Sequence, residues 1–247
     1  MKNLLIIGGT TEARQLAELT VHKYGTRLRV ITSWAGRSSR SPDVAGESRI
    51  GGFGGVTGLL GYLKAETIDM VLDASHPFAN QISKHVYEAC TIANVPNFSL
   101  VRSKWDLPNN GKCFELETME AAAKRISHFA KRVFLTTGRQ TLRVFGNMDN
   151  IWFLVRLLER PKEPLMLNNY TLITGFPPFS IKTEKAIMKK YRIDTLISKS
   201  SGGEIPAKIK AALELDLTTV LVSAPPLPPG EYTNNLDECL KWISSKI

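Results

Sequence analysis

The chain has 247 residues, of which 43% are hydrophobic and 22% are charged, a balance typical of a globular protein with a sizeable core. The net charge of +9 favours a polyanionic small molecule or a nucleotide as partner over nucleic acid, because no long basic run occurs. Three separated cysteines and four unclustered histidines predict neither a disulfide framework nor a metal site. With no apolar run of membrane length and no secretory signal, a cytoplasmic protein that does not span a membrane is expected.

Short apolar runs alternate with amphipathic stretches, the βαβ rhythm of mostly parallel sheets flanked by helices. Strands are expected at residues 4–7, 27–32, 70–73, 97–100, 132–136, 151–154, 195–198 and 219–222. Helices are expected at residues 12–23, 58–66, 77–94, 119–129, 183–191, 206–214 and 235–245. The Pro- and Gly-containing segment 104–113 predicts a crossing between two domains, residues 1–103 and 104–247, with the last helix free to pack back on the first domain.

The first strand ends in a glycine turn that opens a helix, the entry of a nucleotide-binding βαβ unit. The spacing is a degenerate dinucleotide fingerprint, with Gly8 first, Thr10 at the second glycine position and Ala13 at the third. Helix N-termini bind pyrophosphate through free N–H groups, and Thr10 or Thr11 either donates a hydroxyl to phosphate or only caps the helix. The cofactor-binding candidates are Gly8, Gly9, Thr10, Thr11 and Glu12.

The loop after the second strand lacks the acid that holds the ribose 2′-hydroxyl of NAD, since the nearest acid is Asp43. Ser33 and Arg37 suit a 2′-phosphate, because a guanidinium binds phosphate through two hydrogen bonds. NADPH is therefore the expected cofactor, with NADH as an alternative. Arg37 could instead be solvated or contact an acidic substrate.

Two further loops of the first half carry candidates for substrate binding. Glycines 51, 52, 54 and 55 surround Phe53 and permit close approach of a flat ligand, unless the loop is merely flexible. In residues 73–79, Pro77 is expected to begin a helix capped by Ser75 or His76. His76 at this strand end could donate a proton, bind a carboxylate or be structural. The substrate-binding candidates here are Gly52, Phe53, Gly54, Ser75, His76 and Phe78.

Two loops of the second half combine hydroxyls, glycine and a cation, a pattern typical of anion binding. In residues 136–140 and 198–203 the cofactor-binding candidates are Thr137, Gly138, Arg139, Ser201 and Gly202. Arg139 and Lys199 are also candidates for substrate binding. Lys199 is a candidate general acid as well, so His76 and Lys199 are the two catalytic candidates.

Together these segments resemble the precorrin-6A reductase family of cobalamin (vitamin B12) biosynthesis. The resemblance rests on residues 7–14, 33–37, 49–55, 73–79, 136–139 and 198–203, and the run His76-Pro77-Phe78 is its most specific part. It implies an α/β protein of two Rossmann-like domains, each with a mostly parallel sheet flanked by helices, and an active site in the interdomain cleft. It also implies reduction of one macrocycle double bond in precorrin-6A or cobalt-precorrin-6A by NADPH or NADH, with an acidic tetrapyrrole as substrate.

The chain departs from the family pattern at two places. Ser200 follows Lys199 where relatives often have Asn, and Ser223-Ala224-Pro225 stands where an Arg-Pro pair is usual. The second departure removes one candidate contact to a substrate carboxylate, so Arg139 or Lys199 is expected to carry more of it. We expect a monomer or weak homodimer.

Two other functions remain open from the sequence. A short-chain reductase or epimerase needs a Tyr-x-x-x-Lys pair, but Tyr87 is followed by Thr91 and Tyr24 by Leu28 at that spacing. Another NADPH-dependent reductase of a polyanionic substrate is one alternative, and a non-catalytic NAD(P)-sensing module is the other. The sensing module would explain the first two loops but not the glycine–aromatic loop and the His-Pro-Phe loop.

Overall fold

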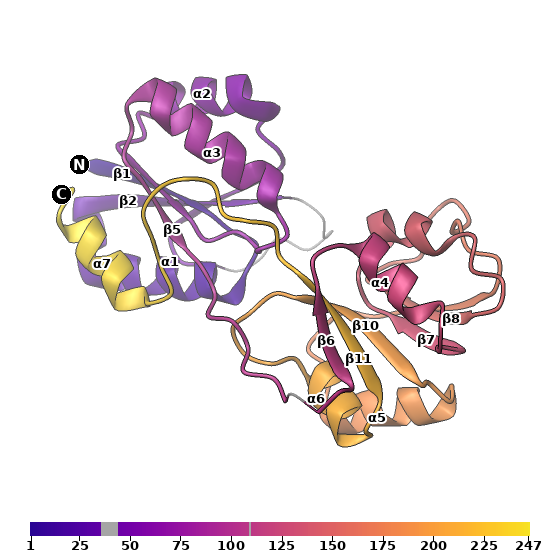
Figure 1. Ribbon diagram of the computed structural model, residues 1–247. Helices are drawn as coiled ribbons and strands as arrows, with labels where there is room; N and C mark the ends of the chain where they lie inside the picture. The colour runs from indigo at the N-terminus through magenta and orange to yellow at the C-terminus, as the bar shows by residue number, and fades with distance from the viewer. Residues whose placement is uncertain (36–43, 109) are drawn as a thin grey trace. The chain divides into compact units, whose positions relative to one another are not determined.

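Two parallel six-stranded sheets organise the computed structural model, which describes residues 1–35, 44–108 and 110–247. The chain divides into two compact units, Met1–Ser103 with Pro225–Ile247, and Lys104–Ala224. Each unit is an α/β layer structure with helices on both faces of its sheet (Figure 1). The prediction of an α/β fold with two mostly parallel, helix-flanked sheets is confirmed.

The first sheet has the strand order β12-β5-β4-β1-β2-β3, and neighbouring strands run parallel. Its strands are β1 (Lys2–Ile7), β2 (Leu28–Trp34), β3 (Glu47–Ile50), β4 (Met70–Asp73), β5 (Asn97–Leu100) and β12 (Tyr232–Thr233). The apolar residues Leu4–Ile7 make β1 a central strand because they are buried on both faces, as in sheets covered by helices on two sides.

Helices cover both faces of this sheet. They are α1 (Thr11–Tyr24), α2 (Gly55–Ala65), α3 (Asn80–Ala93) and α7 (Leu236–Ser244), with a 3₁₀ turn at Gly25–Arg27. Leu4 and Ile6 pack into one core with α1 and α7, whereas Leu5 and Ile7 pack into a second core with α2 and α3. The alternation of β1 residues between two cores follows from the two-residue repeat of a strand.

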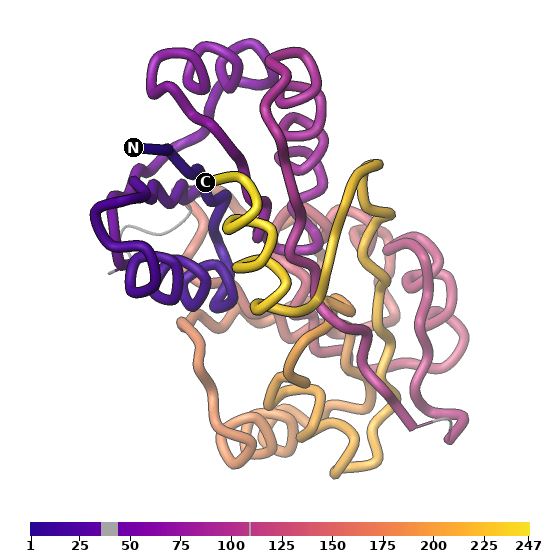
Figure 2. The backbone as a smooth tube through the Cα atoms, turned by 90° about the vertical axis from the view of Figure 1, so that its left-hand side faces the viewer, coloured from indigo at the N-terminus to yellow at the C-terminus, as the bar shows by residue number. Residues whose placement is uncertain are grey.

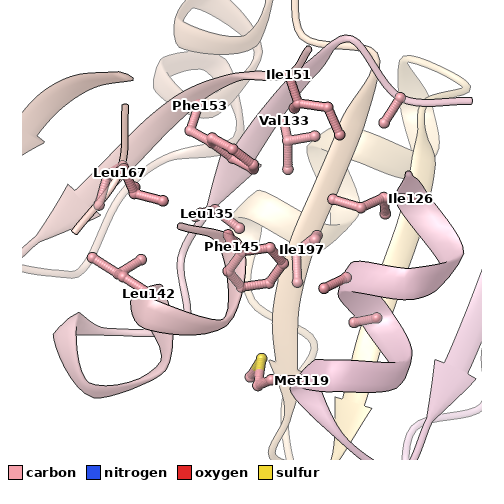
Figure 3. Close-up of a cluster of buried hydrophobic side chains, with 14 of the residues drawn as sticks. Met119, Ile126, Val133, Leu135, Leu142, Phe145, Ile151, Phe153, Leu167 and Ile197 are labelled. Carbon is pink, nitrogen blue, oxygen red and sulfur yellow. The ribbon is translucent and has the colours of Figure 1, made fainter. Parts of the chain in front are cut away.

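The second sheet has the order β6-β11-β10-β7-β8-β9, again with parallel neighbours. Its strands are β6 (Cys113–Leu116), β7 (Arg132–Leu135), β8 (Trp152–Leu157), β9 (Tyr170–Thr174), β10 (Thr195–Ser200) and β11 (Thr218–Ser223). Helix α4 (Met119–Ile126) and the 3₁₀ helix η2 (Arg139–Phe145) contribute to the core on one face, where Phe145 and Phe153 meet (Figure 3). Helices α5 (Ile181–Lys190) and α6 (Ala207–Glu214) contribute to the core on the other face.

The chain passes between the units twice. In each case the first strand after the crossing becomes an edge strand of the sheet in the unit that the chain enters. Strand β6 follows β5 in sequence but pairs with β11, whereas β12 follows β11 but pairs with β5. The C-terminal segment then places α7 beside α1, where the Tyr24 hydroxyl donates to the Leu240 carbonyl at 3.0 Å (Figure 2). Residues 225–247, which we expected to follow the second domain with only the last helix packing back, are grouped with the first unit.

Among the described residues, no helix combines the length and the apolar character needed to cross a bilayer. The same residues contain no cluster of three or more His, Cys, Asp or Glu side chains that could hold a metal ion.

Candidate functional site

The loops after β1 and β4 meet the end of β2 at the carboxyl edge of the first sheet. The amide of Gly8 donates to the Ser33 carbonyl at 2.8 Å, and the amide of Ala74 donates to the Ile7 carbonyl at 3.0 Å. The Thr10 hydroxyl donates to the Ala74 carbonyl at 2.7 Å. Ligands of open α/β sheets bind at this edge, so two of the predicted loops, together with Ser33 at the described start of a third, are assembled where a cofactor is expected.

The glycine turn after β1 fits a pyrophosphate. A Cβ on Gly8 would lie 3.1 Å from the Ser33 carbonyl oxygen, so the close packing of β1 on β2 favours glycine there. Gly9 has a φ of +120° and open space where a Cβ would stand. Helix α1 begins directly after this turn, and the free N–H groups of its first turn suit an anion.

Thr10 is the cap of α1 and not a ready phosphate donor. Its hydroxyl oxygen accepts from the Ala13 amide at 3.0 Å, and its single proton goes to Ala74. Of the two roles open for Thr10 from sequence, the capping role is therefore the one seen. The backbone N–H groups are left to meet a phosphate.

Glu12 lies in the first turn of α1 and is paired with Arg102, which follows β5. The Arg102 Nη2 to Glu12 Oε2 distance is 2.6 Å, and both side chains are partly buried. Partial burial raises the pKa of the Glu12 carboxyl. The hydrogen bonds from Arg102 and from the Glu12 backbone, with the charge of Arg102, outweigh it, so the pKa lies below its usual value. The positive charge of Arg102 thus offsets the negative charge of Glu12 at the N-terminus of α1, where a phosphate is expected.

Ser33, the penultimate residue of β2, is joined to the glycine–aromatic loop through Arg49. Arg49 Nη1 donates to Ser33 Oγ at 2.7 Å and to the Gly51 carbonyl at 3.0 Å, and its guanidinium lies 4.0 Å from the Phe53 ring centroid. Ser33 is only 4% exposed, and the hydrogen bond that its hydroxyl accepts helps to orient the Arg49 guanidinium. Arg37, the candidate for the 2′-phosphate, lies outside the described residues.

The glycine–aromatic loop is anchored at both ends. The Gly51 amide donates to the Trp34 carbonyl at 2.8 Å, and Gly54 caps α2 with a left-handed φ of +83°. Phe53 packs edge-on against Tyr62 with ring centroids 5.2 Å apart. These contacts place Gly52, Phe53 and Gly54 beside the end of β2.

The loop after β4 holds His76 in a turn. The Ala79 amide donates to the His76 carbonyl at 2.6 Å, and the Phe78 amide donates to His76 Nδ1 at 3.2 Å. Because Nδ1 accepts a hydrogen bond, it is unprotonated, and the proton of the neutral ring is on Nε2. The ring centroids of His76 and Phe78 are 6.0 Å apart.

The expected helix start at Pro77 is wrong, because residues 76–79 form the turn and α3 begins at Asn80. No side chain caps this helix, so neither Ser75 nor His76 has the capping role expected from sequence. Ser75 instead shares a hydrogen bond with Ser83, Oγ to Oγ at 3.1 Å, and its amide donates to Asp73 Oδ1 at 2.9 Å.

The candidates of the second unit lie after β7 and β10. The Thr141 hydroxyl donates to Thr137 Oγ1 at 2.8 Å, and Gly138 has a φ of +88°. Arg139 Nη2 lies 2.8 Å from Glu163 Oε2 in an exposed ion pair. Lys199 is the penultimate residue of β10, so the loop that holds Ser201 and Gly202 begins two residues later.

Charged residues that the sequence analysis did not single out lie near the same edge of the second sheet. Arg156 of β8 is bound to Glu184 of α5 through two contacts of 3.0 and 2.9 Å, and both side chains are buried. Lys208 is the second residue of α6, and burial, followed by the charge of Arg156, lowers its pKa to about 8. A lone charge directly after the apolar run Phe153-Leu154-Val155 was the available signal for Arg156.

The described first-unit candidates from Gly8 to Phe78, which exclude Arg37, are thus gathered at one sheet edge, with Arg49 and Arg102 as cations that sequence reasoning left without a role. Thr136 links β7 to β10, because its hydroxyl donates to the Ile197 carbonyl at 3.1 Å. His76 belongs to the first unit and Lys199 to the second.

Comparison with known proteins identifies the family to which the chain belongs. The family model described as precorrin-6x reductase CbiJ/CobK matches residues 3–244. The precorrin-6A reductase of Mycobacterium tuberculosis is 38% identical over 99% of this chain and 98% of its own length. The cobalt-precorrin-6A reductase of Priestia megaterium is 25% identical over 95% of each chain. A solved structure titled CobK precorrin-6A reductase superimposes with a TM-score of 0.90 at 32% identity, covering 100% of this chain and 97% of that one. The chain belongs to the precorrin-6x reductase family and is an oxidoreductase of cobalamin biosynthesis acting on a CH–CH group.

Proposed function

We propose that the protein reduces metal-free precorrin-6A with NADPH. The observation that carries this is the assembly of the Gly8–Glu12, Ser33 and Asp73–Phe78 loops at one edge of the first sheet by backbone and Thr10 hydrogen bonds. Metal-free substrate is favoured because the precorrin-6A reductase of M. tuberculosis is 38% identical, against 25% for the cobalt-precorrin-6A reductase of P. megaterium.

The first unit holds the dinucleotide in this proposal. Gly8, Gly9 and the amides of Thr11 and Glu12 bind the pyrophosphate, since the turn is open at Gly9 and the helix presents its N-terminus there. The bound nicotinamide supplies the hydride. The 2′-phosphate form is favoured because residues 35–42, directly after β2, contain no acid for a ribose hydroxyl and two arginines.

Substrate carboxylates need cations, and the second unit supplies them. Arg139 follows β7, and Lys199 is the penultimate residue of the neighbouring parallel strand β10, so both lie toward the carboxyl edge of the second sheet. Thr137, Gly138, Ser201 and Gly202 line the same two loops and are assigned to anionic groups of cofactor or substrate. In the first unit, Gly52, Phe53, Gly54, Ser75 and Phe78 are assigned to the flat macrocycle.

Reduction of a carbon–carbon double bond adds a hydride to one carbon and a proton to its neighbour. We assign the proton to the imidazolium form of His76, which gives one proton to the carbon and returns to the neutral ring that accepts from the Phe78 amide. The imidazole regains its proton from solvent after each turnover. Lys199 is the second candidate donor.

The test is turnover of purified protein with NADPH and either metal-free or cobalt-loaded precorrin-6A, followed at 340 nm. Faster oxidation of NADPH with the metal-free substrate is expected, and faster turnover with the cobalt form would overturn that choice. His76→Asn keeps an oxygen able to accept from the Phe78 amide, so a fall in kcat of about 10²–10⁴-fold reports the lost acid. The exposed His128→Ala serves as control, and an unchanged kcat in His76→Asn would remove His76 as the donor.

A further inference from the structure

Arg49 occupies the place beside the end of β2 where a Rossmann unit distinguishes the two nicotinamide dinucleotides. Strand β3 pairs with β2 so that Arg49 stands opposite Ser33. Ser33 is in turn joined to the glycine turn, because its carbonyl accepts from the Gly8 amide. Two short links therefore connect the guanidinium to the pyrophosphate turn.

The hydrogen bonds of Arg49 to other described residues use three of the five N–H donors of its guanidinium and leave two. Nη1 gives its two protons to Ser33 Oγ and the Gly51 carbonyl, and Nη2 gives one to the Gly52 carbonyl at 3.2 Å. Within the described ranges, neither the Nε–H nor the second Nη2–H has an acceptor. Three bonds thus fix the group and two donors remain, the number that a bidentate phosphate contact needs.

The aromatic rings hold the guanidinium plane. Its central carbon lies 4.0 Å from the Phe53 ring centroid and 4.9 Å from that of Tyr62. A guanidinium so stacked is pre-organised and loses little freedom on binding an anion. Arg49 is only partly buried, so the two remaining donors are accessible to a ligand.

We propose that Arg49 binds the 2′-phosphate of NADPH through its Nε–H and Nη2–H and that Ser33 is its positioning residue. The proposal rests on the proposed function, because it assumes that the first unit holds the dinucleotide. The discrimination between NADPH and NADH is thereby assigned to Arg49 of β3 and not to the loop after β2.

The experiment compares the affinities of adenosine 2′,5′-bisphosphate and 5′-AMP for the full chain by calorimetry, without substrate or turnover. Wild type is expected to prefer the bisphosphate by about tenfold or more, the scale of hydrogen bonds to a charged group. Arg49→Gln should bring this ratio close to one while the Kd for 5′-AMP changes by less than about threefold. Ser33→Ala should lower the ratio less than Arg49→Gln does, because the two carbonyl contacts of Arg49 remain.

Arg125→Gln is the matched control, because Arg125 is an exposed arginine of the second unit that also stacks on a ring, at 4.4 Å from Phe114. An unchanged affinity ratio in Arg49→Gln overturns the proposal. An equal loss of affinity for both ligands also overturns it, because Arg49 would then only hold the glycine–aromatic loop in place. Should Arg49→Gln not fold, Arg49→Lys keeps the charge without the fork, and an unreduced ratio there also overturns it. A wild type that shows no preference contradicts NADPH as the cofactor, which is the failure of the proposed function and not of Arg49 alone.

Discussion

The buried ion pair between Arg156 and Glu184 makes the second unit sensitive to the loss of one charge. Their side chains are 9% and 2% exposed, and the guanidinium is packed 4.2 Å from the Phe179 ring centroid. Glu184→Gln removes the negative charge but keeps the shape. A buried guanidinium without its counter-charge costs about 3–5 kcal/mol of stability.

Urea unfolding followed by circular dichroism measures this loss. With an m-value of about 2 kcal/mol/M, the midpoint should fall by roughly 2 M. Glu163→Gln is the matched control, because its pair with Arg139 is 80% and 51% exposed and should be worth less than about 1 kcal/mol.

The double replacement Arg156→Met with Glu184→Leu separates the cost of an unpaired charge from the value of the pair. Replacing both partners by apolar residues is expected to be close to neutral, within about 1 kcal/mol. A Glu184→Gln variant as stable as the control would refute the reasoning, and so would a double variant that loses as much as the single one.

Three further variants test other parts of the structure. Gly58→Ala would place a Cβ 1.7 Å from the Phe53 carbonyl oxygen, so it should displace the glycine–aromatic loop and weaken the affinity for adenosine 2′,5′-bisphosphate measured by calorimetry. Thr10→Val removes both the helix cap and a buried donor and should cost about 1–3 kcal/mol in urea unfolding, whereas Thr10→Ser, which keeps the hydroxyl, should cost less. The pKa of Lys208 is about 8 in the folded chain and about 10.4 unfolded, so the unfolded chain holds more protons between these values and stability should rise with pH there. Lys208→Met should be more stable at pH 7 and should show a smaller slope between pH 8 and 10, and an equal slope would contradict this.

The sequence predicted the inner strands and missed the outer ones for a physical reason. The eight strands expected from apolar runs are β1, β2, β4, β5, β7, β8, β10 and β11. The four others, β3, β6, β9 and β12, are the edges of the two sheets. Edge strands are covered less completely, as the mostly exposed Glu47–Ile50 shows, so they lack the apolar run by which a buried strand is recognised.

The candidate site shows the same division between local and tertiary information. The glycine turn and the cap at Thr10 are local patterns, and the sequence predicted both. The pairing of Glu12 with Arg102 joins residues 90 positions apart, so only the order of strands in the sheet reveals it. Arg49 was visible within a motif, but its link to Ser33 depends on the register of an edge strand.

The order in which the strands are made has a consequence for synthesis. The whole of Lys104–Ala224 is inserted in the chain between β5 and β12, so the first unit is closed by residues that are synthesised after the entire second unit. Until then the core beside α1 lacks Cys239, Leu240 and Ile243 from α7. The second unit, whose sequence is complete earlier, is able to fold while the first still exposes an apolar face and an unpaired β5. During translation the first unit is therefore completed after the second, and a chain truncated after Ala224 would leave the β5 edge open to pairing with other strands.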